Sequence, residues 1–198
     1  MTHSPPRVPV VALVASVGGL QAFSEVLGGL PAGFPAAVLV LQHLEPARAS
    51  HLARILDERT PLHVHEAVSG AALQAGHVYV APPGCHLEVT GVRTLALSDA
   101  PKVEYSRPSA DVLLRSLAAA GEPVIAVVLT GRGQDGAVGC VQVRRGGGTV
   151  LAQDQGTSEE FGMPGAAALA GGVDEVLPLA EIAPRLIVLL HNLNHPHG

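Results

Sequence analysis

The sequence is poor in aromatic side chains: it has no tryptophan, two tyrosines and three phenylalanines among 198 residues. Its core must therefore be built from Val, Leu, Ala and Ile, which suits stacked layers of strands and helices. Basic residues are also few, because 12 Lys and Arg stand against 17 Asp and Glu, for a formal net charge of −5. This balance argues against a partner held through nucleic-acid phosphates, so we expect no nucleic-acid binding.

Long apolar runs and clustered cysteines are missing too. No apolar run approaches the roughly 18 residues of a membrane span, and the N-terminal MTHSPPR lacks the apolar centre of a signal peptide. We therefore expect a cytoplasmic protein that is not inserted in a membrane. The two cysteines, Cys85 and Cys140, lie far apart without metal-ligand spacing, and we interpret both as small core residues.

What the chain has in quantity is apolar and turn-forming residues. Hydrophobic residues make up 47% of it and charged residues 15%, so it can bury a large core. The 23 glycines and 16 prolines fall mostly between the apolar runs, where turns are expected. We find no repeat and no interdomain linker, and predict that residues 1–198 form a single domain.

The segment from Val8 to Gly19 is central to the interpretation. Its first half is a run of β-branched and other apolar residues without alternation, typical of a strand that is buried on both faces. The chain then passes through Ser16-Val17-Gly18-Gly19 into a helical pattern. Ser16 therefore follows the carboxyl end of a strand, at a turn whose N–H groups can bind an anion or an oxyanion. A simple N-cap is the alternative role of this serine.

The remaining elements alternate between strands and helices. This order predicts an α/β fold with a mostly parallel, doubly wound sheet flanked by helices. Two segments on either side of Thr90-Gly91-Val92 predict an antiparallel hairpin inserted in the sheet. The predicted strands are Val8–Val14, Ala36–Gln42, Leu62–Val68, His77–Val80, His86–Val89, Arg93–Leu97, Val124–Leu129, Thr149–Ala152 and Val173–Leu177, and the predicted helices include Ala47–Glu58, one opened by Pro108, one with Val138, Val141 and Val143, Pro164–Ala170 and Ala180–Leu193.

Two further polar residues follow strands of this sheet. His43 comes directly after the second strand, and Asp135 lies in the glycine-rich turn 130–136 after the strand that ends at Leu129. Because the carboxyl ends of parallel strands meet at one edge, we expect both to lie near Ser16. Ser, His and Asp are the residue types of a nucleophile, its general base and the carboxylate that orients the base. Singly, His43 could be a core histidine and Asp135 a helix cap.

Other candidate sites are weaker. His63, His65, His77 and His86 are numerous, but lack carboxylate or cysteine partners at ligand spacing, so we predict no metal site. The glycine-rich turns contain neither G-x-G-x-x-G after the first strand nor G-K-[ST], and we predict no cofactor. Arg107 and Ser109 precede a predicted helix, where substrate contact and helix capping are equal alternatives.

Six motifs cover nearly the whole chain, namely ASVGGLQA at 15–22, LVLQHLEP at 39–46, HVYVAPPGCHLEV at 77–89, RPSADVLLRS at 107–116, VVLTGRGQDGAVG at 127–139 and AQDQGTSEEFGMPGAAALAGGVDEV at 152–176. In sequence and in order they resemble the catalytic domain of the chemotaxis receptor protein-glutamate methylesterase (CheB-type) family. The resemblance implies a parallel-sheet α/β domain with an antiparallel hairpin.

The resemblance also implies an activity and the residues for it. The activity is hydrolysis of glutamate γ-methyl esters on the cytoplasmic helices of chemoreceptors, with glutamine deamidation as a second reaction. Ser16, His43 and Asp135 match the family's catalytic triad. Backbone N–H groups of Val17 and Arg132, with Gly18 beside them, match the oxyanion and substrate-binding turns, and Arg107 is a further candidate for substrate contact.

The sequence departs from the family pattern in three respects. Val17 replaces a usual Thr, and Arg132 and Gln134 replace Met and Asn in the turn of Asp135. Arg132 puts a cation near the site, where it would favour an acidic substrate or block the pocket. Family members usually carry an N-terminal receiver domain, which we expect to be absent here, so a separate response regulator is a candidate partner. These departures keep open the alternative of a catalytically weak CheB-like binding module in a chemosensory complex.

Overall fold

The computed structural model describes residues 8–43, 50–91, 93–121 and 123–194, and most of its strands form one sheet. The sheet has seven strands, all parallel, in the order β3-β4-β2-β1-β7-β8-β9. The strands are β1 (Val10–Ala15), β2 (Ala37–Gln42), β3 (His63–Glu66), β4 (His77–Val80), β7 (Val124–Val128), β8 (Thr149–Gln153) and β9 (Glu175–Leu177). This confirms the predicted α/β class and the parallel sheet.

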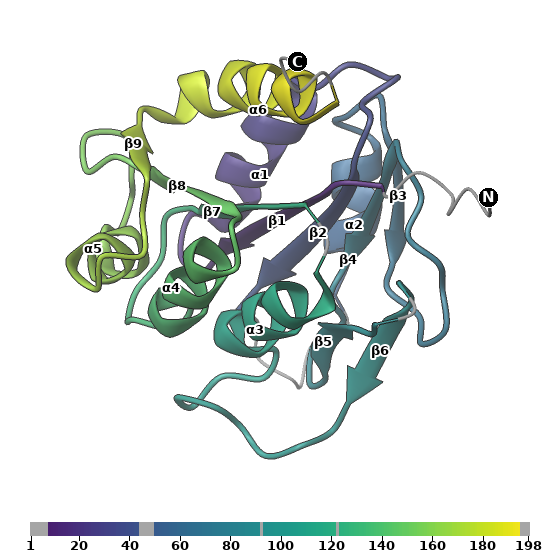
Figure 1. Ribbon diagram of the computed structural model, residues 1–198, viewed down its shortest axis with the longest axis horizontal. Helices are drawn as coiled ribbons and strands as arrows, with labels where there is room; N and C mark the ends of the chain where they lie inside the picture. Colours follow the sequence, from purple (N-terminus) through teal and green to yellow (C-terminus); the bar gives the residue numbers. More distant parts are fainter. Residues whose placement is uncertain (1–7, 44–49, 92, 122, 195–198) are drawn as a thin grey trace.

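Helices cover both faces of the sheet, as Figure 1 shows. On one face, α1 (Gly19–Gly28), α2 (Leu52–Asp57) and α6 (Leu179–Asn194) bury Phe23, Leu56 and Ile182 in one hydrophobic cluster. On the other, α3 (Ala110–Ala120), α4 (Ala137–Arg145) and α5 (Gly162–Leu169) contribute Leu113, Val143 and other residues to a second cluster. The sheet therefore lies between two helical layers and is doubly wound.

The central strand β1 shows why the apolar run lacks alternation. All six residues of Val10–Ala15 are buried, because successive side chains point into different clusters: Val11 and Leu13 into one, Val10 and Val14 into the other. A strand that meets helices on both faces needs apolar side chains at every position. The chain then leaves β1 through Gly18, whose φ of 80° lies in the left-handed region that favours glycine.

The hairpin is present, but it does not belong to the main sheet. β5 (His86–Val89) and β6 (Leu95–Ser98) pair antiparallel as a separate two-stranded sheet. Leu87, Val89 and Leu95 are buried in the same cluster as α3, against which β5 packs. The predicted antiparallel hairpin is therefore confirmed, and it forms a sheet of its own that extends the helical layer beside α3, as seen in Figure 1.

Two helices differ from their predicted form. The segment predicted as a helix from 47 to 58 is helical only over Leu52–Asp57, and residues 47–49 lie outside the described residues. In α4, the valines that predict this helix do not share one buried side, because Val138 is half exposed whereas Val143 is buried. The buried side of α4 is formed by Gly139, Cys140 and Val143, since a side chain at 139 would collide with Leu114 of α3. Close packing of the two helices decided which face turned inward.

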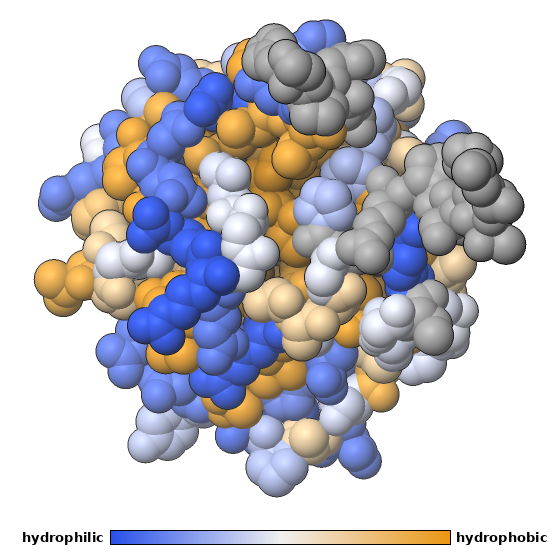
Figure 2. All heavy atoms as spheres, in the orientation of Figure 1, coloured by the Kyte–Doolittle hydropathy of each residue, from blue (hydrophilic) through white to orange (hydrophobic). Residues whose placement is uncertain are grey.

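On the face of Figure 2, hydrophilic and hydrophobic residues are interspersed, with apolar atoms at the edge formed by α5. Leu169 of α5 is among the exposed large apolar residues.

No helix in the described part of the chain is long and apolar enough to cross a bilayer. The strand order reverses beside β1, with β2 on one side and β7 on the other. Such a switch point is where open parallel sheets form their ligand sites.

Candidate active site

Ser16, His43 and Asp135 follow three neighbouring strands at this switch point. Ser16 follows β1, His43 follows β2, and Asp135 lies in the turn between β7 and α4. Hydrogen bonds continue the sheet beyond the strands, from Ser16 N–H to Thr130 O at 3.0 Å and from His43 N–H to Ala15 O at 3.1 Å. The backbone positions of the serine and the histidine are thus fixed by the sheet.

His43 and Asp135 are in direct contact. Nε2 of His43 lies 2.7 Å from Oδ2 of Asp135, and the two side chains are 16% and 4% exposed. Since Nε2 is engaged by the carboxylate, Nδ1 is the nitrogen left for the proton of a nucleophile. Within the described residues no hydrogen bond joins Ser16 Oγ to the ring. Such bonds are often long before substrate binds and tighten in the reacting complex.

The carboxylate of Asp135 is held at the N-terminus of α3. Its Oδ2 accepts from Ala110 N–H at 2.7 Å, and its Oδ1 accepts from Asp111 N–H at 3.0 Å and from Ser109 Oγ at 2.8 Å. Burial alone would raise the pKa of Asp135, but the hydrogen bonds, from His43 first, outweigh it and hold the pKa below its ordinary value. The group is therefore a fixed anion, which also interacts favourably with the helix dipole.

Ser109 has a role that sequence reasoning missed. The sequence predicts a helix cap or a substrate contact at this position, yet the side chain of Ser109 caps no N–H group of α3. Its hydroxyl instead donates to Asp135, and its own N–H donates to His86 Nδ1 at 3.2 Å. His86 Nε2 lies 3.1 Å from Pro101 O, so this histidine, once a metal candidate, is a buried structural link. The contact of Ser109 with Asp135 depends on the packing of α3 beside the turn of Asp135, which the local sequence does not indicate.

A second buried carboxylate, Asp111, lies behind the site. Its Oδ1 accepts from Gly139 N–H at 2.7 Å and so ties the first turn of α3 to α4. Burial raises the pKa of Asp111, with a further contribution from the charge of Asp135. Cys140 lies nearby, and burial together with these carboxylates raises the pKa of its thiol to about 12. That cysteine is a core residue as predicted, whereas Cys85 is only half buried.

The turn that carries Ser16 is held from two sides. On the β2 side, Gln42 Nε2 donates to Ser16 O at 2.5 Å, and a Cβ on Gly19 would lie 2.1 Å from Gln42 Oε1. On the β7 side, the hydroxyl of Thr130 donates to Val17 O at 3.0 Å. Only a glycine at 19 leaves room for the glutamine that anchors the serine.

Two predicted oxyanion donors lie in this region with their N–H groups unused. In the part of the chain that the structure describes, neither Val17 N–H nor Arg132 N–H donates an intramolecular hydrogen bond. Gly131, next to Arg132, lies so close to the serine that a Cβ there would be 2.9 Å from Ser16 Cβ. The two turns therefore meet beside the serine, an arrangement that can bind a developing negative charge.

The side chains of Arg132 and Arg107 are engaged elsewhere. Nε and Nη2 of Arg132 donate to Glu160 Oε1 at 2.8 and 2.6 Å, so this exposed cation is paired with a carboxylate, although substrate contact by Arg132 stays a prediction. Nη1 of Arg107 donates to the carbonyls of Asp99 and Ala100 at 2.6 and 3.0 Å. Those bonds make Arg107 an anchor of the loop before α3, although substrate contact by this residue stays a prediction.

The histidines of β3 and β4 form a separate surface cluster. His65 Nε2 lies 3.1 Å from His77 Nδ1, and the ring of His63 lies 5.2 Å from that of His77. Burial and the two neighbouring histidines lower the pKa of His77, so this ring favours its neutral form. Among the residues described, no three His, Cys, Asp or Glu side chains are arranged to hold a metal ion.

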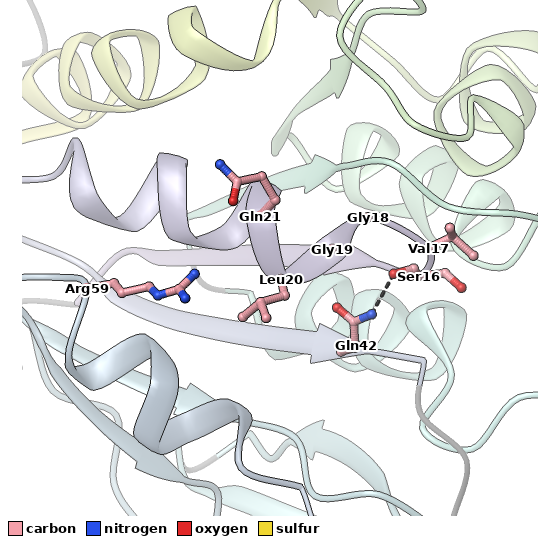
Figure 3. A pocket seen from close by; sticks show the side chains of 8 residues that line it. All are labelled: Ser16, Val17, Gly18, Gly19, Leu20, Gln21, Gln42 and Arg59. Carbon is pink, nitrogen blue, oxygen red and sulfur yellow. Dashed lines mark hydrogen bonds between the residues drawn. The ribbon is translucent and has the colours of Figure 1, made fainter.

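An open cavity of about 480 Å³ borders Ser16 on its β2 side. Figure 3 shows its lining, which runs from the Ser16–Gly19 turn past Leu20 and Gln42 to Arg59. The amide of Gln42 points to the Ser16 main chain, whereas the serine hydroxyl points away from it. A substrate chain that presents a side chain to Ser16 has room to lie along this cavity.

Comparisons with known proteins agree with this architecture. A family model described as CheB methylesterase matches residues 11–186. The protein-glutamate methylesterase FrzG of Myxococcus xanthus is 41% identical over 92% of this chain and 55% of its own, and a protein-glutamate methylesterase/protein-glutamine glutaminase of Anaeromyxobacter dehalogenans is 46% identical over 91% and 53%. The chain thus spans about half the length of the curated relatives it matches.

A solved structure shares the whole fold. The crystal structure of the Thermotoga maritima CheB methylesterase catalytic domain superposes with a TM-score of 0.88 at 36% identity, covering 93% of this chain and all of that one. The seven-stranded sheet, its helices and the separate hairpin are therefore the arrangement of a catalytic domain of that kind.

Proposed function

The chain belongs to the CheB methylesterase family, and we propose that it hydrolyses glutamate γ-methyl esters on the cytoplasmic helices of chemoreceptors. The observation that carries the proposal is the contact of His43 Nε2 with the buried anion of Asp135, at the sheet edge where Ser16 stands. Nucleophile, base and orienting carboxylate are the groups that acyl transfer requires. The reaction takes place, on this proposal, in the cytoplasm.

The first half of the reaction forms an acyl-enzyme. Ser16 Oγ attacks the ester carbonyl carbon while Nδ1 of His43 takes its proton, and Asp135 stabilises the imidazolium through Nε2–H. The oxyanion of the tetrahedral intermediate accepts from the unused N–H groups of Val17 and Arg132. Collapse breaks the bond to the methoxy oxygen, which leaves as methanol with the proton from His43.

The second half restores the enzyme. A water molecule gives its proton to Nδ1 of His43 and attacks the γ-glutamyl ester of Ser16. The intermediate collapses to a free glutamate side chain, and the proton returns to Ser16 Oγ. With glutamine as substrate the same steps release ammonia in place of methanol, which accounts for a glutaminase activity like that in the names of the relatives.

The nucleophile can be tested by methanol release from a methylated receptor fragment. We expect release by the natural chain and by Ser69→Ala, which removes an exposed hydroxyl on a distant loop, and none above background by Ser16→Ala. Circular dichroism of the three proteins checks that they share one fold. Absence of methanol with the natural chain would contradict the proposal and favour the binding module.

A further inference from the structure

The cavity beside Ser16 ends at a cation. Arg59 follows α2 and lines the cavity together with Leu20, Gln42 and the Ser16 turn. In Figure 3 its guanidinium points along the cavity toward Leu20, which lies between Arg59 and the serine. Leu20 is 36% exposed, so an apolar stretch separates the reacting group from the charge.

The guanidinium of Arg59 has no carboxylate partner among residues 8–43, 50–91, 93–121 and 123–194. Its one hydrogen bond within that part of the chain runs from Nη1 to the Ser24 hydroxyl at 3.0 Å. Arginine carries five N–H donors in a planar fork that matches a carboxylate. Four other arginines already bind Asp or Glu side chains, namely Arg54, Arg132, Arg144 and Arg185. Arg59 therefore retains the capacity to bind an external anion.

The opposite side of Ser16 carries the opposite charge. A Cβ on Gly18 would lie 2.8 Å from Glu159 Oε2, which places this carboxylate over the Ser16 turn on the β7 side. The next residue, Glu160, binds Arg132, whereas Glu159 forms no ion pair within the described part of the chain, so its negative charge is left over. A substrate segment lying across the serine meets a cation at one end and an anion at the other.

We propose that Arg59 is a specificity-determining residue, which binds a carboxylate carried by the substrate on the β2 side of its ester group. The inference rests on the proposed function, because it concerns the chain that bears the methyl ester. Leu20 then contacts the apolar part of that chain, and Glu159 disfavours a second carboxylate on the β7 side. The substrate class is a γ-methyl glutamyl segment with its acidic neighbour on one side only.

Synthetic helical peptides test this arrangement directly. Three peptides carry a glutamate γ-methyl ester with Glu one helical turn before it, Glu one turn after it, or Gln at both places. Methanol release gives kcat/KM for each with the natural chain, Arg59→Gln, Arg59→Lys and Arg54→Gln. Arg54 is the matched control, since it lies on α2, is 67% exposed, pairs with Glu58 and lies outside the cavity lining.

We expect the natural chain and Arg54→Gln to prefer one acidic peptide over the Gln peptide. Arg59→Gln should lose that preference through an increase in KM of about three- to tenfold, and Arg59→Lys should retain part of it. Equal preference in Arg59→Gln and the natural chain overturns the inference but leaves the proposed function intact. A natural chain that does not distinguish the peptides overturns it as well. No methanol from any peptide or receptor fragment overturns the proposed function itself.

Discussion

The hydroxyl of Ser109 lies 2.8 Å from Oδ1 of Asp135, on the carboxylate oxygen that does not face His43. Ser109 is completely buried, and its donor is the only hydroxyl among the groups bound to this anion in the described residues. It therefore acts on the imidazole indirectly, by fixing the rotation of the carboxylate and by stabilising its charge.

Replacing Ser109 with Ala should reduce kcat by roughly tenfold, which corresponds to about 1.4 kcal/mol in the barrier. Because one hydrogen bond to the anion is lost, the pKa of Asp135 should also rise and the acid limb of the pH–rate profile should move to higher pH. Ser116→Ala is the control, since it removes another hydroxyl from α3 that binds Val89 N–H. An acid limb that does not move would leave Ser109 with a merely structural role.

Asp135→Asn should reduce turnover by roughly 10³-fold or more, because the amide cannot orient His43 and stabilise its cation as the carboxylate does. It should also lower stability. Because the pKa of Asp135 is lowered in the folded protein, its ionised carboxylate stabilises the fold above the ordinary aspartate pKa of about 4. This stabilisation is lost as the pH falls through the pKa of Asp135 in the folded protein. The difference in Tm between the variant and the natural chain should thus be largest near neutral pH and shrink in acid. A difference that grows in acid would contradict this.

The charge of Asp111 affects the stability of the fold in the opposite direction to that of Asp135. Its raised pKa means that the folded protein holds a proton more tightly than the unfolded chain, so ionisation at neutral pH destabilises the fold. Asp111→Asn keeps an oxygen for Gly139 N–H and removes the buried charge. We expect a higher Tm than the natural chain at neutral pH, with the gain disappearing as pH falls below the raised pKa. Thermal unfolding followed across pH measures it.

Gly131→Ala should impair catalysis through a steric effect. The added Cβ would lie 2.9 Å from Ser16 N and 2.4 Å from Met163 Sδ, and although the methionine can move, the serine backbone is held by the sheet. Displacement of Ser16 should lower kcat/KM by about tenfold or more. Gly33→Ala provides the control, because a Cβ there meets no atom within 4 Å. Equal activity of the two variants would exclude a close approach of Gly131 to Ser16.

Arg132→Met restores the usual family residue and keeps the backbone N–H, so turnover should stay within about tenfold of the natural chain. The variant also leaves Glu159 and Glu160 without their shared cation. With an acidic substrate, kcat/KM should therefore fall at low salt and recover as salt is added. Glu160→Gln, which releases the guanidinium, should give the opposite salt slope. Identical slopes in the two variants would show that these charges do not act on the substrate.

The sequence by itself determined the parallel sheet and the order of its elements. The continuous apolar run of Val10–Ala15 can only be buried on both faces, and the right-handed connections of such a sheet bring successive strand ends to one edge. These two features predict that Ser16, His43 and Asp135 lie at the same edge of the sheet. Family motifs in the same order supplied the expected chemistry.

The tertiary structure alone decided the environment of those residues. Ser109 and Arg59 carry no local signal, because one acts through the packing of α3 against a distant turn and the other through a cavity between α1 and the end of α2. The hairpin forms a separate two-stranded sheet, because its apolar side chains are buried against α3. The sequence predicts a cation at Arg132 that would favour an acidic substrate or block the pocket, but it does not indicate that this side chain is bound by Glu160, which lies 28 residues later in the chain. Contacts between segments so far apart depend on how the elements pack, and local sequence patterns do not encode that packing.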